Sequence, residues 1–103
     1  MTETKLKVTV EPISGAFTVL GAEVGDREWI RTPGTKGSRE RNVSPPVLAR
    51  VGGTGVTGAT YKVTMEYVGT RTKFETTRSL ENGRDSIQVD CLPSEFKARE
   101  ETQ

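Results

Sequence analysis

The residues with the chemistry for ligand binding gather between positions 29 and 41. Five side chains here are candidate contacts with a ligand or a partner: Trp29, Arg31, Lys36, Arg39 and Arg41. Guanidinium groups bind carboxylates and phosphates through paired hydrogen bonds, and an indole ring can stack on a nucleobase. Glu40 is the single acid among residues 31–41, so the region carries net positive charge. It is a candidate binding site for an anionic or carbohydrate ligand; the alternative is a solvated loop beside a core tryptophan.

Catalytic machinery is the chemistry that the sequence does not supply. The chain has no histidine, which removes the commonest general base and the commonest metal ligand. Its one cysteine, Cys91, alternates in phase with Ile87 and Val89, which predicts a buried thiol rather than a nucleophile. The 14 acidic residues are scattered without a calcium-binding spacing. We therefore expect a protein that is not an enzyme and that has no catalytic residues, metal or cofactor.

Three regularly spaced glycines invite comparison with nucleotide-binding loops. Gly52, Gly55 and Gly58 follow an apolar segment, and such glycines let backbone N–H groups approach a pyrophosphate at the start of a helix. The residues from Gly58 to Tyr67 alternate between apolar and polar, which predicts a strand where a nucleotide site needs a helix. We interpret residues 52–58 as a flexible loop between strands.

The net charge of the chain is too small for strong nonspecific attraction to polyanions. The chain has 15 Lys and Arg residues against 14 Asp and Glu residues, for a net charge of +1. Attraction to nucleic acid or to an anionic membrane is therefore not expected. No apolar run is long enough for a transmembrane helix, and the first residues lack the pattern of a signal peptide. As written, the chain is expected in the cytoplasm; as a fragment of a longer protein, it would fit a secreted or particle-associated setting.

Alternation between apolar and polar residues predicts strands along most of the chain. The clearest case is residues 61–67, where four apolar residues are separated by polar ones. Shorter segments rich in β-forming residues complete the prediction: 5–11, 16–22, 27–31, 47–51, 72–80 and 86–91. The dipeptide Asn82-Gly83 favours a tight turn with positive φ at both positions, so it predicts a hairpin between the last two strands.

Two segments without an apolar pattern are predicted to lie outside the sheets. Residues 32–46 contain prolines and glycines and predict a long loop. Residues 93–103 are highly charged and predict a mostly disordered tail that follows a single domain over residues 1–92. Pro12 cannot donate a ladder hydrogen bond, so we expect the first strand to end there or to run at an edge, which Lys5 and Lys7 would protect.

The number and spacing of the strands predict an all-β domain. The favoured architecture is an antiparallel two-sheet sandwich of six to eight short strands, and a small closed β-barrel is the alternative. The run Tyr61-x-Val-x-Met-x-Tyr67, followed by Leu80 and Ser86-Ile-Gln-Val89, resembles the middle strands of fibronectin type III and other immunoglobulin-like domains. This resemblance implies an immunoglobulin-like architecture.

Without a catalytic pair, the sequence favours a non-catalytic protein–protein interaction or assembly module, including a structural component of a larger particle. Domains of this kind act through surfaces and sheet edges, and one of their modes is strand addition. The expected partner is another protein or a second copy of the chain, whereas nucleic acid and membrane are not expected. The alternative function is a binding domain for an anionic or carbohydrate ligand through Trp29 and the Arg31–Arg41 region.

Overall fold

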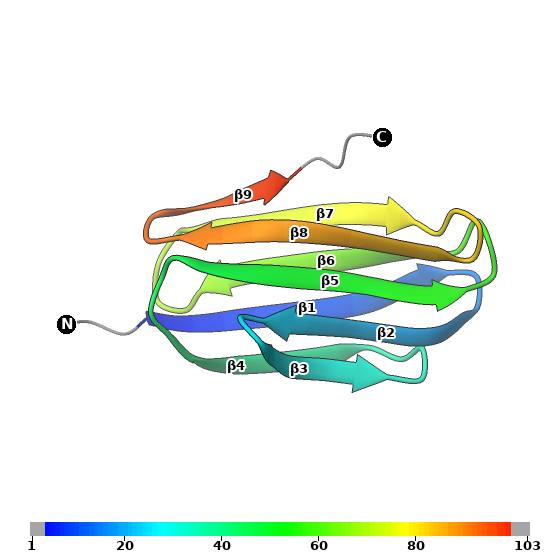
Figure 1. Cartoon of the computed structure of the whole chain (residues 1–103), viewed down its shortest axis with the longest axis horizontal. Coiled ribbons are helices and arrows are strands. Elements are labelled where there is room, and N and C mark those ends of the chain that lie inside the picture. Colours follow the sequence, from blue (N-terminus) through cyan, green and yellow to red (C-terminus); the bar gives the residue numbers. More distant parts are fainter. Residues whose placement is uncertain (1–3, 100–103) are drawn as a thin grey trace.

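The computed structural model describes residues 4–99 and shows nine β-strands in two sheets (Figure 1). The strands are β1 (Thr4–Ser14), β2 (Phe17–Val24), β3 (Arg27–Thr32), β4 (Gly37–Val43), β5 (Val47–Gly55), β6 (Thr60–Tyr67), β7 (Lys73–Ser79), β8 (Arg84–Leu92) and β9 (Glu95–Arg99). The four-stranded sheet has the order β4-β1-β6-β7, and the five-stranded sheet has the order β3-β2-β5-β8-β9. Every pairing is antiparallel. The predicted all-β sandwich is confirmed, and the closed barrel is excluded because each sheet keeps two edge strands.

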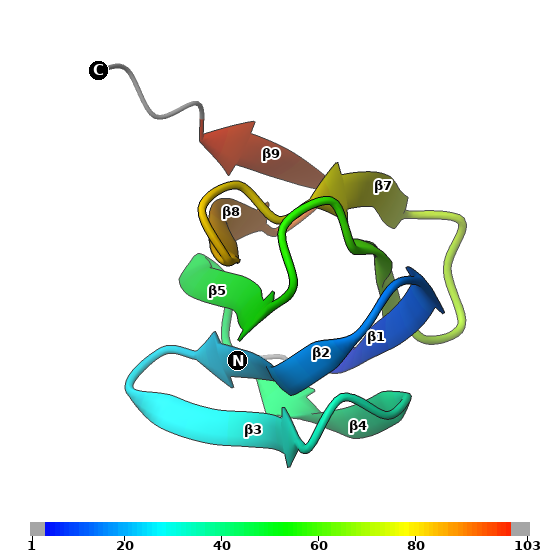
Figure 2. The same ribbon diagram turned by 90° about the vertical axis from the view of Figure 1, so that its right-hand side faces the viewer.

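The two sheets lie face to face, with β3 beside β4 at one side and β9 beside β7 at the other (Figure 2). β1 and β2 belong to different sheets, whereas the first two strands of an immunoglobulin domain pair with each other. The immunoglobulin-like topology is therefore not confirmed. The described residues also form more strands than expected, because charged edge strands show no apolar alternation.

Inward-facing side chains from both sheets form one hydrophobic core. On β6, the four apolar residues of the alternating segment are each at most 1% exposed, which confirms the predicted buried face: Tyr61, Val63, Met65 and Tyr67. The inward residues of β8 are buried in the same cluster: Ile87, Val89 and Cys91. The strict period of two on both strands therefore reflects a core between two sheets.

Two tyrosines of β6 reach across the core and bind β8 in the opposite sheet. The Tyr61 hydroxyl donates to the Asp85 carboxylate at 2.6 Å, and the Tyr67 hydroxyl donates to the Leu92 carbonyl at 2.6 Å. Asp85 and Leu92 stand near opposite ends of β8, so each end of the strand is tied to β6. The rings supply apolar bulk while their hydroxyls stay hydrogen-bonded, as buried polar groups require.

Residues 32–46, predicted as a loop, contain an edge strand. The prediction was wrong for Gly37–Val43, which pair with β1 over seven consecutive positions. The sequence signal is weak because β4 is exposed on its outer face and carries Arg39 and Arg41 at inward positions. Glycine is needed at the start of the strand, because a Cβ on Gly37 would lie 2.5 Å from Cγ2 of Ile30 on β3.

The glycine-rich segment is also mostly strand. Residues 52–55 belong to β5 between β2 and β8, so the prediction of a flexible loop was wrong for them. A Cβ on Gly53 would lie 2.6 Å from the carbonyl oxygen of Val19, and one on Gly55 would lie 2.7 Å from Cα of Phe17. These glycines allow close backbone approach where β2 is bulged. The segment after Gly58 is a strand, as predicted, and not a nucleotide-binding helix.

The turn at Asn82-Gly83 was predicted correctly, but the hairpin was not. Asn82 and Gly83 have φ values of 55° and 79°, and Glu81 and Arg84 exchange backbone hydrogen bonds of 2.9 and 3.2 Å. However, β7 pairs with β6, and β8 pairs with β5 and β9, so this turn carries the chain from one sheet to the other. The residue types at 82 and 83 determine the conformation of the turn, whereas burial of side chains in the core determines which strands pair.

Both expectations for the first strand were wrong, because β1 lies between β4 and β6 and continues past Pro12 to Ser14. Pro12 has no N–H to donate, but no hydrogen bond to β4 is lost there, because the pairing of β1 with β4 already ends at Val10 and Gly37. The Val68 N–H donates to the Lys5 carbonyl, so alternate residues of β1, including Pro12, direct their backbone groups toward the β4 side. At Pro12 that side has no strand.

The charged C-terminal segment contributes a ninth strand, which differs from the predicted tail over residues 93–103. Residues 95–99 pair with β8, and the ring of Phe96 stacks on Tyr67 with centroids 4.7 Å apart. Phe96 is the one large apolar residue of the segment, and its burial against the core offsets the exposure of its charged neighbours. Residues 1–3 of the predicted domain and residues 100–103 of the predicted tail lie outside the described residues.

Replacing Tyr67 by Phe tests the bridge to β8. The Leu92 carbonyl loses the Tyr67 hydroxyl as a donor, so we expect the free energy of unfolding to fall by about 1–2 kcal/mol, measured by urea denaturation with Trp29 fluorescence. Burial raises the pKa of the Tyr67 hydroxyl to about 12. The stability linked to this group is complete below the unfolded value of about 10 and is lost as pH rises toward 12. The Phe variant should therefore lose less stability over that range; identical alkaline profiles would contradict the bridge.

Candidate functional site

Trp29, the aromatic candidate, lies in the core. A β-bulge on β3 pairs Ala22 with Ile30 and Glu23 with Glu28, which leaves Trp29 as the extra residue. The bulge turns Trp29 and Ile30 into the interior together, where they are 5% and 6% exposed. The indole is thus closed to a stacking ligand, and the core interpretation of this tryptophan is confirmed.

Arg39 and Arg41 lie on the core-facing side of β4, at the side of the sandwich where the edge strands β3 and β4 lie next to each other. They pair with Val8 and Leu6 of β1, whose side chains are buried, so both arginines share the core-facing side of the sheet. Arg41 lines a shallow hollow between β3 and β4 together with Trp29 and Arg27. Sequence reasoning missed Arg27, because only the pairing of Val24 with Arg27 shows that it shares the inner side.

The other two candidates lie elsewhere. Arg31 pairs with Gly21 on the outer face of the five-stranded sheet, where its guanidinium lies 3.8 Å from the Glu28 carboxylate. Lys36 lies in the exposed turn between β3 and β4. The five predicted contacts therefore do not form one surface, and the structure brings together Trp29, Arg41 and the unpredicted Arg27, with Arg39 next along β4.

Positive charge accumulates at the side formed by β3 and β4. Among the ion pairs within residues 4–99, none involves Arg27, Arg39 or Arg41. Glu40 points to the opposite face of β4, where it lies 3.8 Å from Lys5. The hollow between β3 and β4 is lined by Arg27 and Arg41 and by no carboxylate of residues 4–99, so an anion that enters it would meet two guanidinium groups. We call Arg27, Arg39 and Arg41 the β3–β4 arginine cluster.

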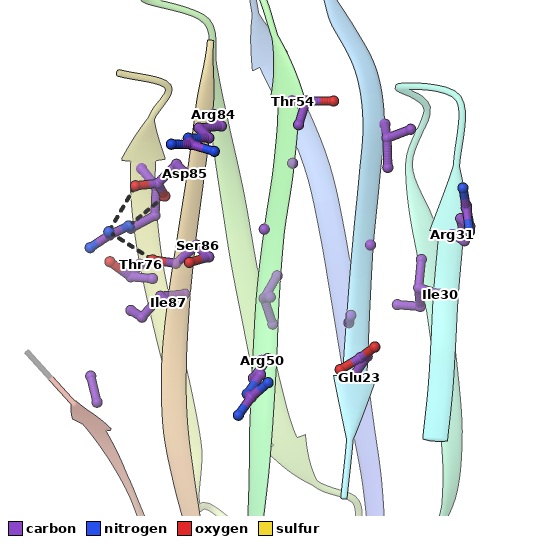
Figure 3. Close-up of a pocket in the computed structure, with 18 of the residues that line it drawn as sticks. Glu23, Ile30, Arg31, Arg50, Thr54, Thr76, Arg84, Asp85, Ser86 and Ile87 are labelled. Atoms are coloured by element: carbon purple, nitrogen blue, oxygen red, sulfur yellow. Dashed lines mark hydrogen bonds and ion pairs between the residues drawn. The ribbon is translucent and has the colours of Figure 1, made fainter. Parts of the chain in front are cut away.

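A larger hollow extends over the outer face of the five-stranded sheet and into the opening between β7 and β8 (Figure 3). Gly21 and Gly52 are neighbours on β2 and β5 and form a floor without side chains. The surrounding side chains carry both charge signs: Glu23, Arg31, Arg50 and Arg84. The hollow is shallow and solvent-open, which suits contact with a macromolecule better than enclosure of a small substrate.

Arg78 binds the part of β8 that is not paired with β9. Within residues 4–99, the pairing of β9 with β8 covers Gln88 to Leu92. Beyond that point, Arg78 donates two hydrogen bonds of 2.9 Å to Asp85 and a third of 3.3 Å to the Ser86 carbonyl (Figure 3). Burial and the hydrogen bond to Asp85 raise the pKa of Tyr61, and the hydrogen bond to Asp85 raises that of Arg78. At neutral pH Tyr61 and Arg78 therefore keep their protons, and their hydrogen bonds to Asp85 tie β6 and β7 to β8.

Comparison of the chain with protein-family models, with curated proteins and with solved structures finds no match. Within residues 4–99, no three metal-ligating side chains come together, and no helix is long and apolar enough to cross a membrane. The features with the clearest binding chemistry in this part of the chain are the arginine cluster and the four edge strands β3, β4, β7 and β9.

Burial should make the Cys91 thiol unreactive. The side chain is fully buried, and burial raises the pKa of the thiol to about 12. At pH 8 we expect labelling by a disulfide reagent to be at least about 100-fold slower in the folded protein than in denaturant, because the thiolate is the reactive form. Fast labelling of the native protein at the rate of a free thiol would contradict the buried position.

Proposed function

We propose that this domain is a non-catalytic protein-interaction or assembly module that takes up a partner strand along the free edge of β7. The observation that carries the proposal is the open and regular edge of this strand. A free edge presents unpaired N–H and C=O groups that can template another strand, and natural proteins guard edges that are not used for binding. The four edge strands differ in this protection.

Three of the four edges carry a recognisable guard. β3 is interrupted by the bulge at Trp29, which twists the edge locally. β4 carries Arg39 and Arg41 on its inner side, and a strand added there would remove water from their charges. In the described part of the chain β9 has five residues, and one of them is the exposed Lys97. Each of these features disfavours the addition of a further strand.

β7 has no bulge and no unpaired inward charge, and its one lysine, the exposed Lys73, stands at its first position. The strand pairs with β6 over seven consecutive positions without a bulge, and its sequence, Lys73–Ser79, contains no proline. Thr76 and Thr77 at its centre are β-branched and suit a strand. The one inward charge is Arg78, which Asp85 already neutralises through two hydrogen bonds. A strand that pairs with β7 would therefore meet no unpaired inward charge.

The hydrogen-bond phase identifies the groups that a partner strand would use. The Tyr67 N–H donates to the Thr72 carbonyl at one end of the β6–β7 pairing, and the Leu80 N–H donates to the Ala59 carbonyl at the other end. These two bonds fix which residues of β7 are hydrogen-bonded to β6. Since bonded and non-bonded pairs alternate in an antiparallel ladder, the even-numbered residues of β7 bond to β6. The backbone groups that face outward belong to the alternate residues: Lys73, Glu75, Thr77 and Ser79.

A proline at position 77 tests the proposal. Thr77→Pro removes one outward N–H but no hydrogen bond to β6, so the fold should persist while strand addition is weakened. The immobilised wild-type domain would first be used to retain binding proteins from a cell extract. Each retained protein would then be identified, purified and titrated against each variant by calorimetry. We expect the affinity of a strand-adding partner to fall by tenfold or more for Thr77→Pro.

Two matched variants control for side-chain and proline effects. Thr77→Ala keeps the N–H and should bind as the wild type does. Glu40→Pro places a proline at an outward position of β4, since Arg39 and Arg41 face β1, and it should also bind normally. Equal binding by all three variants, or a loss confined to Glu40→Pro, would refute the role of β7.

The β3–β4 arginine cluster supports a second candidate function, the binding of an anionic ligand. Its support is the absence of an ion-pair partner for Arg27, Arg39 and Arg41 within residues 4–99. In a titration with a sulfated oligosaccharide at low salt, the double variant Arg39→Ala/Arg41→Ala should bind at least about tenfold more weakly. Arg31→Ala, on the outer face, is the matched control. Equal affinities of the double variant and the wild type would refute this candidate.

A further inference from the structure

We infer that the strand taken up by β7 is the β7 strand of a second copy of this chain, paired antiparallel about a two-fold axis at Thr76. The inference rests on the proposed role of β7 and names the partner. Two-fold dimers are the commonest assemblies of identical chains, and their interface requires a patch that complements itself. β7 meets this requirement in its hydrogen-bond groups, its charges and its surroundings.

The outward backbone groups of β7 match those of a second copy when the axis passes through Thr76. Lys73 then lies opposite the partner's Ser79, and Glu75 lies opposite the partner's Thr77. All four outward residues of each strand take part, so the pairing uses the whole edge. An axis at Phe74 would match only Lys73 with Glu75, and an axis at Thr77 would leave Lys73 beyond the end of the pairing.

The side chains agree with the same register. On the inner side, Thr76 meets its own copy, and Phe74 lies opposite the partner's Arg78. On the outer side, neither Lys73 nor Glu75 lies directly opposite a like charge. An axis at Glu75 would instead set the two Glu75 carboxylates against each other, and opposed like charges destabilise paired strands.

Within residues 4–99, β9 covers only the first half of β7, which leaves the second half for a second copy. β9 lies over the first half of β7, where Phe96 and Phe74 have ring centroids 6.4 Å apart, and it ends at Arg99 (Figure 1). A two-fold axis at Thr76 places the covered half of one β7 beside the uncovered half of the other. The two β9 strands would thus occupy diagonal positions, and the two four-stranded sheets would join into one continuous sheet.

Site-specific crosslinking tests the register with the full chain. Thr76 faces its copy in a non-hydrogen-bonded pair, whose Cα separation of about 4.5 Å lies within the range of a disulfide. Thr76→Cys should therefore form a covalent dimer under mild oxidation. Thr77→Cys is the matched control, because two copies of residue 77 would lie more than about 7 Å apart, beyond disulfide reach. Cys91 is buried in both variants and should not react.

Sedimentation equilibrium of the protein without cysteine substitutions measures the association itself. We expect a monomer–dimer equilibrium, and Thr77→Pro should raise its dissociation constant about 100-fold, since two symmetric hydrogen bonds of about tenfold each are lost. Glu40→Pro should leave it unchanged. A wild type that stays monomeric at millimolar concentration would overturn the inference, as would crosslinking of Thr77→Cys that equals that of Thr76→Cys.

The two proposals can fail separately. If the wild type is monomeric and a different protein loses affinity for Thr77→Pro, the second-copy inference fails and the role of the β7 edge stands. If Thr77→Pro changes neither self-association nor the binding of any purified partner, both fail.

Discussion

The two hydroxyl bridges from β6 to β8 are the interactions on which the rest of the structure depends. The chain passes repeatedly between the sheets, and hairpins join only β2 to β3, β6 to β7 and β8 to β9. Tyr61 and Tyr67 tie the middle of the four-stranded sheet to the five-stranded one at both ends of β8. Each bond contributes about 1 kcal/mol net, but an unpaired buried partner would cost about 1–3 kcal/mol. The bridges thus hold the sheets in the one alignment that satisfies both ends of β8.

That alignment also determines which edges are open. Because Asp85 is held against β6, Arg78 can bind it and occupy the part of β8 that β9 does not reach. The same ion pair removes the inward charge that would otherwise guard β7. On the opposite side, Arg39 and Arg41 have no such partner in the described chain and protect β4. The asymmetry between the two edges of the four-stranded sheet therefore follows from a single carboxylate on β8.

The sequence predicts the core strands well and the edges poorly. Residues 61–67 and 86–91 alternate because one face of each strand is buried, and Asn82-Gly83 favours a turn with positive φ at both positions, which it adopts here. β4 and β9 bury few side chains, so no periodicity marks them. The buried position of Trp29 was one of two alternatives that the sequence left open, and the grouping of Arg41 with Arg27 depends on a bulge and a register that no local pattern encodes. Strand pairing was the largest gap, because local turn chemistry does not reveal which strands share a sheet.

Amide hydrogen exchange along β7, measured by NMR, tests the central claim most directly. The Thr76 N–H bonds to β6 and should be protected at every concentration, whereas the Glu75 and Thr77 N–H groups should exchange freely in dilute protein. When the protein is concentrated, or when a purified partner binds, Glu75 and Thr77 should become protected while Glu40 on the β4 edge stays unchanged. If Glu75 and Thr77 stay unprotected under all these conditions, or if protection appears at Glu40 instead, β7 is not the recognition edge.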